Sequence, residues 1–255
     1  MKPDKSWLEA LYHKYNHPKW IHPDPLEFVH LYKSPLDQEI VGLIASSLAY
    51  GRVRQILASA ESVLRPMGSS PRDFLLHSTE RTWTKLFQNF RHRFTTAKEL
   101  ISLLKAIKGI IGRYGSLYEC FLKGLSAEHD NVIPALSRFV QELISFDGMP
   151  SSLLPSPEKG SACKRLHMFL RWMVRKDRVD PGLWEQVSPR ILVIPLDTHM
   201  FQQCSRMGMT RRKNANLTCA LEITRHFQKI CPEDPVKYDF ALSRLGIRKE
   251  TFDSR

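Results

Sequence analysis

The chain has 255 residues, of which 42% are hydrophobic and 25% are charged. This composition is typical of a soluble globular protein and excludes a disordered or collagen-like chain. It also excludes a membrane protein, because apolar runs such as Ile191 to Leu196 are far too short to span a bilayer. The 38 lysines and arginines exceed the 26 aspartates and glutamates, which gives a formal net charge of +12. This surplus favours nucleic acid as a partner over acidic small substrates, the other interpretation being a basic protein without a specific polyanion.

The cysteines and the first residues bear on cofactors and compartment. The five cysteines are widely scattered, at positions 120, 163, 204, 219 and 231. No Cys-x-x-Cys pair or Cys/His ladder is present, so we expect no zinc ion, no iron–sulfur cluster and no other cofactor. The polar start MKPDKSW lacks the apolar stretch of a signal peptide. We therefore expect a cytoplasmic protein, associated with the bacterial nucleoid if it acts on DNA.

Apolar residues recur at helical spacing along most of the chain. The pattern predicts helices over 37–50, 53–64, 98–111, 131–145, 162–176, 197–207, 216–229 and 234–246. Clear alternating strands are absent, so we predict an all-α fold. A Pro-, Gly- and Ser-rich break at 148–161 is either a linker or a hairpin between two helices. We predict one two-lobed domain over 1–255, made of an N-terminal extension (1–34), an N-terminal helical lobe (35–147) and a hairpin with C-terminal helices (148–255).

The helix predicted over 162–176 carries the most informative charges. One of its faces is apolar and must be core. The opposite face has a narrow, mostly basic stripe that consists of Lys164, Met168, Arg171 and Arg175, with Arg165 and Trp172 at its edge. Ser161 is the predicted N-cap, which places Lys164 in the first turn, where the helix dipole disfavours a cation. The stripe is either a solvated basic face with a half-buried tryptophan or a surface for an anionic ligand.

The segment IPLDTHMFQQCSRMG begins the next predicted helix at Asp197. The simplest role of Asp197 is that of an N-cap, whose carboxylate accepts hydrogen bonds from backbone amides. A capping carboxylate has a second oxygen that can face a neighbouring site. A capping role and a catalytic role are therefore compatible for Asp197.

Together these segments resemble the helix-hairpin-helix DNA glycosylases of the endonuclease III superfamily. IPLDTHMFQQCSRMG is similar to the superfamily segment VDTHVxRVxxRLG, whose catalytic aspartate corresponds to Asp197. LLPSPEKGSACKRLHMFLRWMVRK has the layout of a hairpin followed by a helix, with Lys164 in the place of the Schiff-base lysine. DQEIVGLIASSLAYGRVRQI and YDFALSRLGIRK resemble the helix pair before the hairpin and the closing helix. The whole chain also resembles a bacterial family of unknown function that contains the same MFLRWMVRK and PLDTH segments.

The resemblance implies a two-lobed helix-hairpin-helix glycosylase-like fold and a base-excision repair enzyme. Such an enzyme cleaves the N-glycosidic bond of a damaged base such as 8-oxoguanine, with or without AP-lyase activity. Lys164 would attack the sugar carbon and form a Schiff base, while Asp197 would stabilise positive charge on the sugar and accept a proton. Met168 and Trp172 would stack on the extruded base. The implied partner is double-stranded DNA with a damaged or abasic nucleotide, bound by a monomer without a metal ion.

The same resemblance assigns phosphate contacts to polar and basic side chains of the C-terminal part. These are Arg165, Arg171, Arg175, Lys176, Arg178, His199, Arg211, Arg212 and Lys213. Two departures from the superfamily concern its hairpin and its cysteines. The hairpin here reads PSPEKGS, with Gly160 alone in place of LPGxG, and the C-terminal cysteine cluster is missing. Because hairpin glycines bring backbone amides close to a phosphate, the alternative is a helical DNA- or RNA-binding protein of the same architecture without chemistry.

Overall fold

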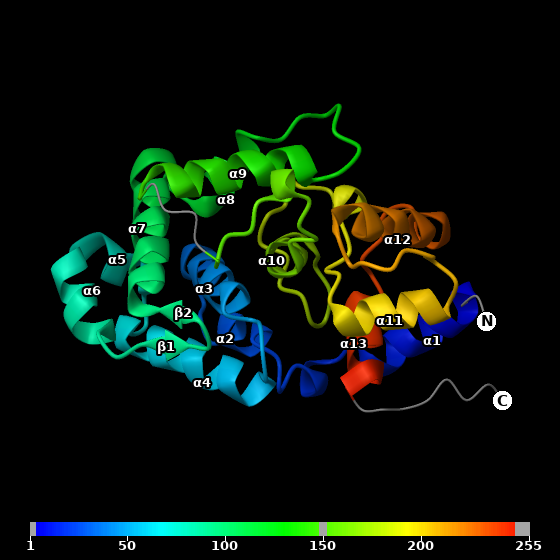
Figure 1. The fold of residues 1–255 in the computed structure, drawn as a ribbon, viewed down its shortest axis with the longest axis horizontal. Coiled ribbons are helices and arrows are strands. Elements are labelled where there is room, and N and C mark those ends of the chain that lie inside the picture. Colours follow the sequence, from blue (N-terminus) through cyan, green and yellow to red (C-terminus); the bar gives the residue numbers. More distant parts are fainter. Residues whose placement is uncertain (1–3, 148–151, 248–255) are drawn as a thin grey trace. The chain divides into compact units, whose positions relative to one another are not determined.

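The computed structural model describes residues 4–147 and 152–247, the side chains of residues 246 and 247 excepted. In this part of the chain there are thirteen α-helices and one two-stranded sheet, so the predicted all-α class is confirmed apart from a short hairpin (Figure 1). The chain forms two compact units, residues 22–158 and residues 1–21 together with 159–255. The expected N-terminal extension over 1–34 is thus divided between the two units. Among the helices that the structure describes, none has the length and hydrophobicity that crossing a bilayer requires.

The unit of residues 22–158 holds most of the helices. They are α2 (Leu26–His30), α3 (Pro35–Ser47), α4 (Val53–Leu64), α5 (Pro71–His77), α6 (Glu80–Phe87), α7 (Ala97–Tyr114), α8 (Leu117–Leu122) and α9 (Ile133–Ser145). Short 3₁₀ turns occur at Arg65–Met67 and Pro157–Lys159. The antiparallel strands β1 (Arg91–His92) and β2 (Thr95–Thr96) form a hairpin before α7. The break predicted at 148–161 lies partly outside the described residues.

Helix α3 is buried along most of its length, because α2, α4, α5 and α8 pack around it. The carboxylate of Glu39, which is only 2% exposed, lies at the start of α8. It accepts hydrogen bonds from the backbone amides of Leu117 and Tyr118 at 2.7 and 3.0 Å. The buried charge is stabilised there by amide donors and by the helix dipole.

Helix α7 illustrates how local signals set the ends of a helix. A capping box between Thr96 and Glu99 begins it, with the Thr96 amide donating to Glu99 Oε2 at 2.9 Å. Gly115 ends it in a left-handed conformation with φ of +86°. The helix predicted over 98–111 is therefore confirmed and extends by one residue at its start and by three at its end.

The second unit combines the start of the chain with its C-terminal helices. Its α-helices are α1 (Lys5–Tyr15), α10 (Lys164–Val174), α11 (Thr198–Arg206), α12 (Leu217–Ile230) and α13 (Asp239–Ile247), with 3₁₀ turns at Pro18–Trp20 and Pro189–Ile191. Helices α1 and α11 both pack on α13. Glu9 on α1 accepts hydrogen bonds from Lys237 Nζ at 2.7 Å and from the Tyr238 hydroxyl at 2.7 Å. These contacts join residues at opposite ends of the sequence (Figure 1).

Two helix starts differ from prediction. Helix α10 begins at Lys164, and Cys163, not Ser161, is its N-cap. Helix α13 begins at Asp239 and not at Asp234, because the preceding residues form turns in which the Lys237 amide donates to the Asp234 carbonyl at 3.2 Å. The predicted starts at residues 197 and 216 are confirmed, since Asp197 and Asn216 are the N-caps of α11 and α12.

Candidate functional site

Lys164 is the first residue of α10, and its backbone setting is unusual. The preceding residue, Cys163, adopts a left-handed conformation with φ of +44°, which is rare for a residue other than glycine. The Cys163 amide donates to Ser161 Oγ at 3.2 Å, which turns the chain sharply into the helix. The Lys164 side chain is half-buried, and its ammonium group has no hydrogen bond or ion pair with any residue that the structure describes. Lys164 is therefore available to a ligand.

The loop before Lys164 is tied to the start of α12. Ser161 forms an isolated antiparallel bridge with Asn216, and the Leu217 amide donates to the Gly160 carbonyl at 3.1 Å. Gly160 has φ of +73°, a conformation that favours glycine. The N-termini of α10 and α12 are thereby brought close together, and the basic segment 211–213 precedes α12 by a few residues. Their partial and formal charges all favour an anion.

Asp197 caps α11, as the sequence predicts. Its Oδ1 accepts a hydrogen bond from the Met200 amide at 2.8 Å, with extended backbone at Asp197. The side chain is half-buried, and its Oδ2 accepts no hydrogen bond from the described residues. One carboxylate oxygen is therefore engaged in capping, and the other is free to act on a ligand.

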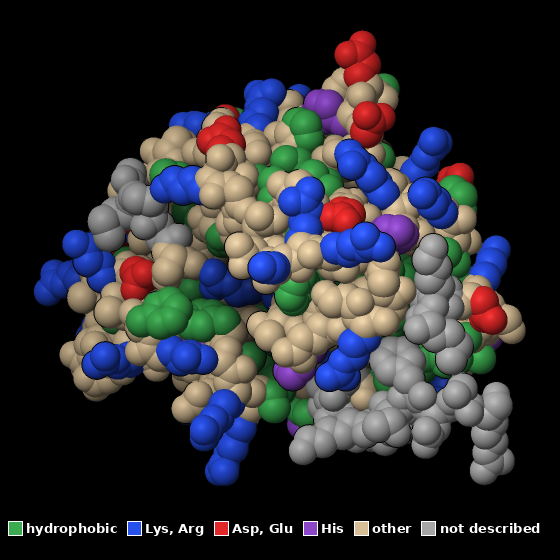
Figure 2. All heavy atoms as spheres, turned by 45° about the vertical axis from the view of Figure 1, so that its right-hand side comes forward, with side chains coloured by type: hydrophobic (Ala, Val, Ile, Leu, Met, Phe, Trp, Pro, Cys, Tyr) green, Lys and Arg blue, Asp and Glu red, His purple; other side chains and the backbone are tan. Residues whose placement is uncertain are grey.

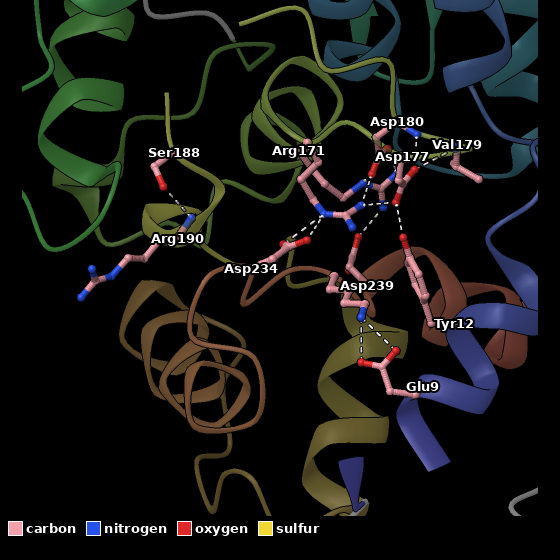
Figure 3. Close-up of polar contacts among 12 residues, drawn as sticks. Glu9, Tyr12, Arg171, Asp177, Val179, Asp180, Ser188, Arg190, Asp234 and Asp239 are labelled. Carbon is pink, nitrogen blue, oxygen red and sulfur yellow. Dashed lines mark hydrogen bonds and ion pairs between the residues drawn. The ribbon is translucent and has the colours of Figure 1, made fainter. Parts of the chain in front are cut away.

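Arg171 and Arg175 do not form a surface for phosphates, which corrects the assignment made from the sequence. They are 4% and 3% exposed. Arg171 Nη1 lies 2.5 Å from Asp239 Oδ2, and Arg175 Nε lies 2.9 Å from Asp234 Oδ2. Both guanidinium groups also pair with Asp180, which is 1% exposed (Figure 3). If these arginines turned outward to bind a phosphate, the buried carboxylates that they pair with would lose their compensating charge.

Burial and nearby charges shift the pKa of Asp239, and one of these charges is that of Asp197. Burial raises the pKa of Asp239 to about 6, although the charge of Arg171 acts in the opposite direction. The negative charges of Asp197 and Asp180 raise the pKa of Asp239 further. The charge of Asp197 therefore acts on the same carboxyl group as the charge of Arg171.

Met168 and Trp172 do not line an open base pocket, which is a second correction. Met168 is 7% exposed and Trp172 is fully buried. The loop after α10 folds back over the helix, with the Gly182 amide donating to the Trp172 carbonyl at 3.2 Å and the Trp184 amide donating to the Met173 carbonyl at 2.7 Å. From Met168 to Arg175 the stripe is thus buried and is neither solvated nor open to a base, whereas Lys164 at the start of the helix is half-buried.

The other residues assigned to phosphate contacts lie on or near the surface. The exposed ones are Lys176, Arg178, His199, Arg211, Arg212 and Lys213. Arg165 is half-buried, and Arg212 Nε pairs with Glu222 Oε2 at 2.6 Å. Lysine and arginine side chains predominate over acidic ones on the face drawn in Figure 2. An excess of positive charge on a surface attracts anionic ligands.

Sequence reasoning missed the acidic members of the buried network. Asp177 and Asp180 follow α10 directly, and Asp234 and Asp239 lie in the segment before α13 and at its start. The composition of α10 could have predicted these acidic partners. An arginine on a helix that is apolar on most sides becomes buried and then needs a nearby carboxylate. Among the described residues no three histidine, cysteine or acidic side chains are arranged to hold a metal ion.

Neither a curated protein nor a solved structure matches the chain. A family model described as "Protein of unknown function (DUF2400)" matches residues 24–248. The matched region spans most of the chain and leaves out α1. The chain therefore belongs to the DUF2400 family.

Proposed function

We propose that this protein is a base-excision repair glycosylase of the helix-hairpin-helix type, with Lys164 as nucleophile and Asp197 as the assisting carboxylate. The observation that carries the proposal is the setting of Lys164. It follows a left-handed Cys163, begins a helix, and has no partner among the described residues. A strained backbone next to an unpaired amine is typical of a functional site.

The reaction requires a nucleophile and a group that stabilises positive charge on the sugar. The Lys164 amine forms a bond to the sugar carbon C1′, while the glycosidic C–N bond breaks and its electron pair leaves with the base, which takes up a proton. The free oxygen of Asp197 stabilises positive charge on the sugar and accepts the proton lost from the amine. Opening of the sugar ring then leaves a C=N bond between Lys164 and C1′, which is the Schiff base.

Phosphate contacts belong, in this proposal, to the exposed basic residues and to the two adjacent helix N-termini. Arg211 and Lys213 precede α12, and the start of α12 is bridged to the loop before Lys164. A backbone phosphate at this position meets both side-chain and amide donors. This arrangement replaces the grip that the hairpin glycines supply in the superfamily that the chain resembles.

Borohydride trapping tests the chemistry directly. The protein is incubated with a duplex that holds an abasic site or 8-oxoguanine, and borohydride reduces any C=N bond to a stable covalent adduct. We expect an adduct with the wild type and none with Lys164→Gln. Lys229→Gln is the matched control, because it removes the same charge from an exposed lysine in the last turn of α12, outside the residues assigned to DNA, and should leave the adduct unchanged. An adduct that persists in Lys164→Gln, or none with any of a panel of lesions, contradicts the proposal.

The burial of Met168 and Trp172 favours a second candidate, a helical nucleic-acid-binding protein without chemistry. With these side chains enclosed, neither of the two residues expected to stack on a base is exposed to one. This candidate predicts DNA or RNA binding whose affinity falls steeply with salt, together with no trapped adduct. The trapping experiment and a salt titration therefore separate the two candidates.

A further inference from the structure

The hairpin in the unit of residues 22–158 presents an aromatic ring to solvent. Arg93 and Phe94 connect β1 to β2, and the Phe94 side chain is 61% exposed. Its ring stacks on that of Tyr50, with centroids 5.0 Å apart and an interplanar angle of 28°. The Tyr50 hydroxyl donates to the His92 carbonyl at 2.9 Å, which fixes the lower ring. Phe94 is therefore the outer layer of a rigid aromatic stack with one open face.

The turn holds an arginine in a conformation that favours glycine. Arg93 has φ of +55°, and Gly51, on which it lies, has φ of +100°. A Cβ atom at Gly51 would be only 2.7 Å from Arg93 Cδ, so the missing side chain makes room for the arginine. Keeping arginine where glycine would be less strained costs stability. Such an outlier points to a role for the Arg93 side chain beyond folding.

Exposed arginines lie on the two segments that adjoin the stack. β1 packs against α4, so the exposed arginines at the start of α4 lie near the hairpin (Figure 1). The exposed arginines of the two elements are Arg52, Arg54, Arg91 and Arg93. None of them is ion-paired with an acidic side chain that the structure describes. An open aromatic face with exposed arginines on the adjoining segments is complementary to a base flanked by phosphates.

We propose that the Tyr50–Phe94 stack and these four arginines form a binding site for single-stranded nucleic acid. An unpaired base stacks on the open face of Phe94, and the neighbouring phosphates pair with the arginines. A free strand fits better than an intact duplex, in which both faces of each base are covered. This inference concerns the other unit and does not depend on the chemistry of Lys164.

Fluorescence anisotropy with a short fluorescein-labelled oligothymidylate tests the site. We expect Phe94→Ala to weaken binding by about 5- to 100-fold, and Phe94→Trp to bind at least as tightly as the wild type. Leu86→Ala is the control, because Leu86 is 48% exposed in the same unit but lies on α6. Arg93→Gly should weaken binding while raising the melting temperature, a combination that a purely structural role does not produce.

Equal affinities of Phe94→Ala and the wild type would overturn the proposal, as would equal losses in Phe94→Ala and Leu86→Ala. A Phe94-dependent loss seen only with a duplex probe would also overturn it. An oligouridylate arm then distinguishes RNA from DNA as the preferred strand. Phe94→Ala should weaken oligothymidylate binding by the same factor in the wild type and in Lys164→Gln. A negative trapping experiment therefore does not contradict this inference.

Discussion

The guanidinium of Arg171 and the carboxylate of Asp239 form an ion pair inside the protein, with Nη1 and Oδ2 2.5 Å apart and both side chains no more than 5% exposed. This pair joins α10 to α13. Arg171 lies about 10 Å along the helix axis from Lys164, on the same side of α10. Asp239 is thus paired with the lysine-bearing helix, and the negative charge of Asp197 raises its pKa.

Replacing Arg171 with alanine should destabilise the fold strongly. The variant leaves Asp180 and Asp239 buried without their shared partner, which typically costs about 3–5 kcal/mol. The free energy of unfolding from urea titration measures this loss. Arg178→Ala is the control, since Arg178 is exposed and its removal should change stability by less than about 0.5 kcal/mol. A stable Arg171→Ala protein with weakened DNA binding would restore the phosphate role that the sequence suggested.

The stability of the protein should depend on His167 below neutral pH. This side chain is 1% exposed, and neither ring nitrogen has a hydrogen-bond partner among the described residues. Burial lowers the pKa of His167 from 6.5 to about 3, so the folded state keeps the ring neutral while the unfolded chain takes up a proton. The contribution of His167 is therefore complete above pH 6.5 and is lost by about 1.4 kcal/mol for each pH unit below it.

The difference between the wild type and His167→Phe isolates this contribution. The raised pKa of Asp239, about 6, acts in the opposite direction, because its stabilising protonated form is lost as pH rises through that value. Asp239 is present in both proteins, so its effect cancels in the difference. Between pH 7 and pH 5 we expect the wild type to lose about 2 kcal/mol relative to the variant in urea titrations. Parallel pH curves for the two proteins would show that His167 is not held neutral.

Asp197 should reveal its two roles through two substitutions. Asp197→Ala removes the oxygen that accepts from the Met200 amide and should cost about 1 kcal/mol of stability. Asp197→Asn keeps a capping oxygen and should stay within a few tenths of a kcal/mol of the wild type. If the proposed chemistry holds, the asparagine variant folds normally yet forms trapped adduct much more slowly. Normal trapping by Asp197→Asn would leave Asp197 as a cap alone.

Gly51 should tolerate no side chain. Gly51→Ala combines a positive φ with a Cβ atom 2.7 Å from Arg93 Cδ, and we expect a loss of about 1–2 kcal/mol or more in thermal or urea unfolding. The double variant with Arg93→Gly should recover the part of the loss that comes from the contact. Full additivity of the two changes would mean that the arginine does not lie on Gly51 in solution.

The salt dependence of DNA binding should depend on which basic side chains are exposed. Each of Arg211→Gln and Lys213→Gln should reduce the slope of log affinity against log salt concentration by about 1, because each removes one exposed positive charge. The buried guanidinium of Arg175 releases no counterions from DNA and should not contribute to the slope. Filter binding or anisotropy over a range of salt concentrations measures it.

Local patterns were sufficient for much of the fold. The helical class, the core helices α3, α4, α7 and α9, and the caps at Asp197 and Asn216 all follow from residue spacing and from short-range hydrogen bonding. These features depend on neighbours within a few turns, so the sequence by itself determines them.

The tertiary structure decided what the charged stripe of α10 faces. From the sequence, Arg171, Arg175, Met168 and Trp172 form a free face, because nothing in the periodicity shows that the loop after α10 folds back over it. The acids that neutralise the arginines come from that loop and from residues about 60 positions further along the chain. Only folding brings such distant carboxylates to a helix, and the high cost of an unpaired buried charge then holds them there.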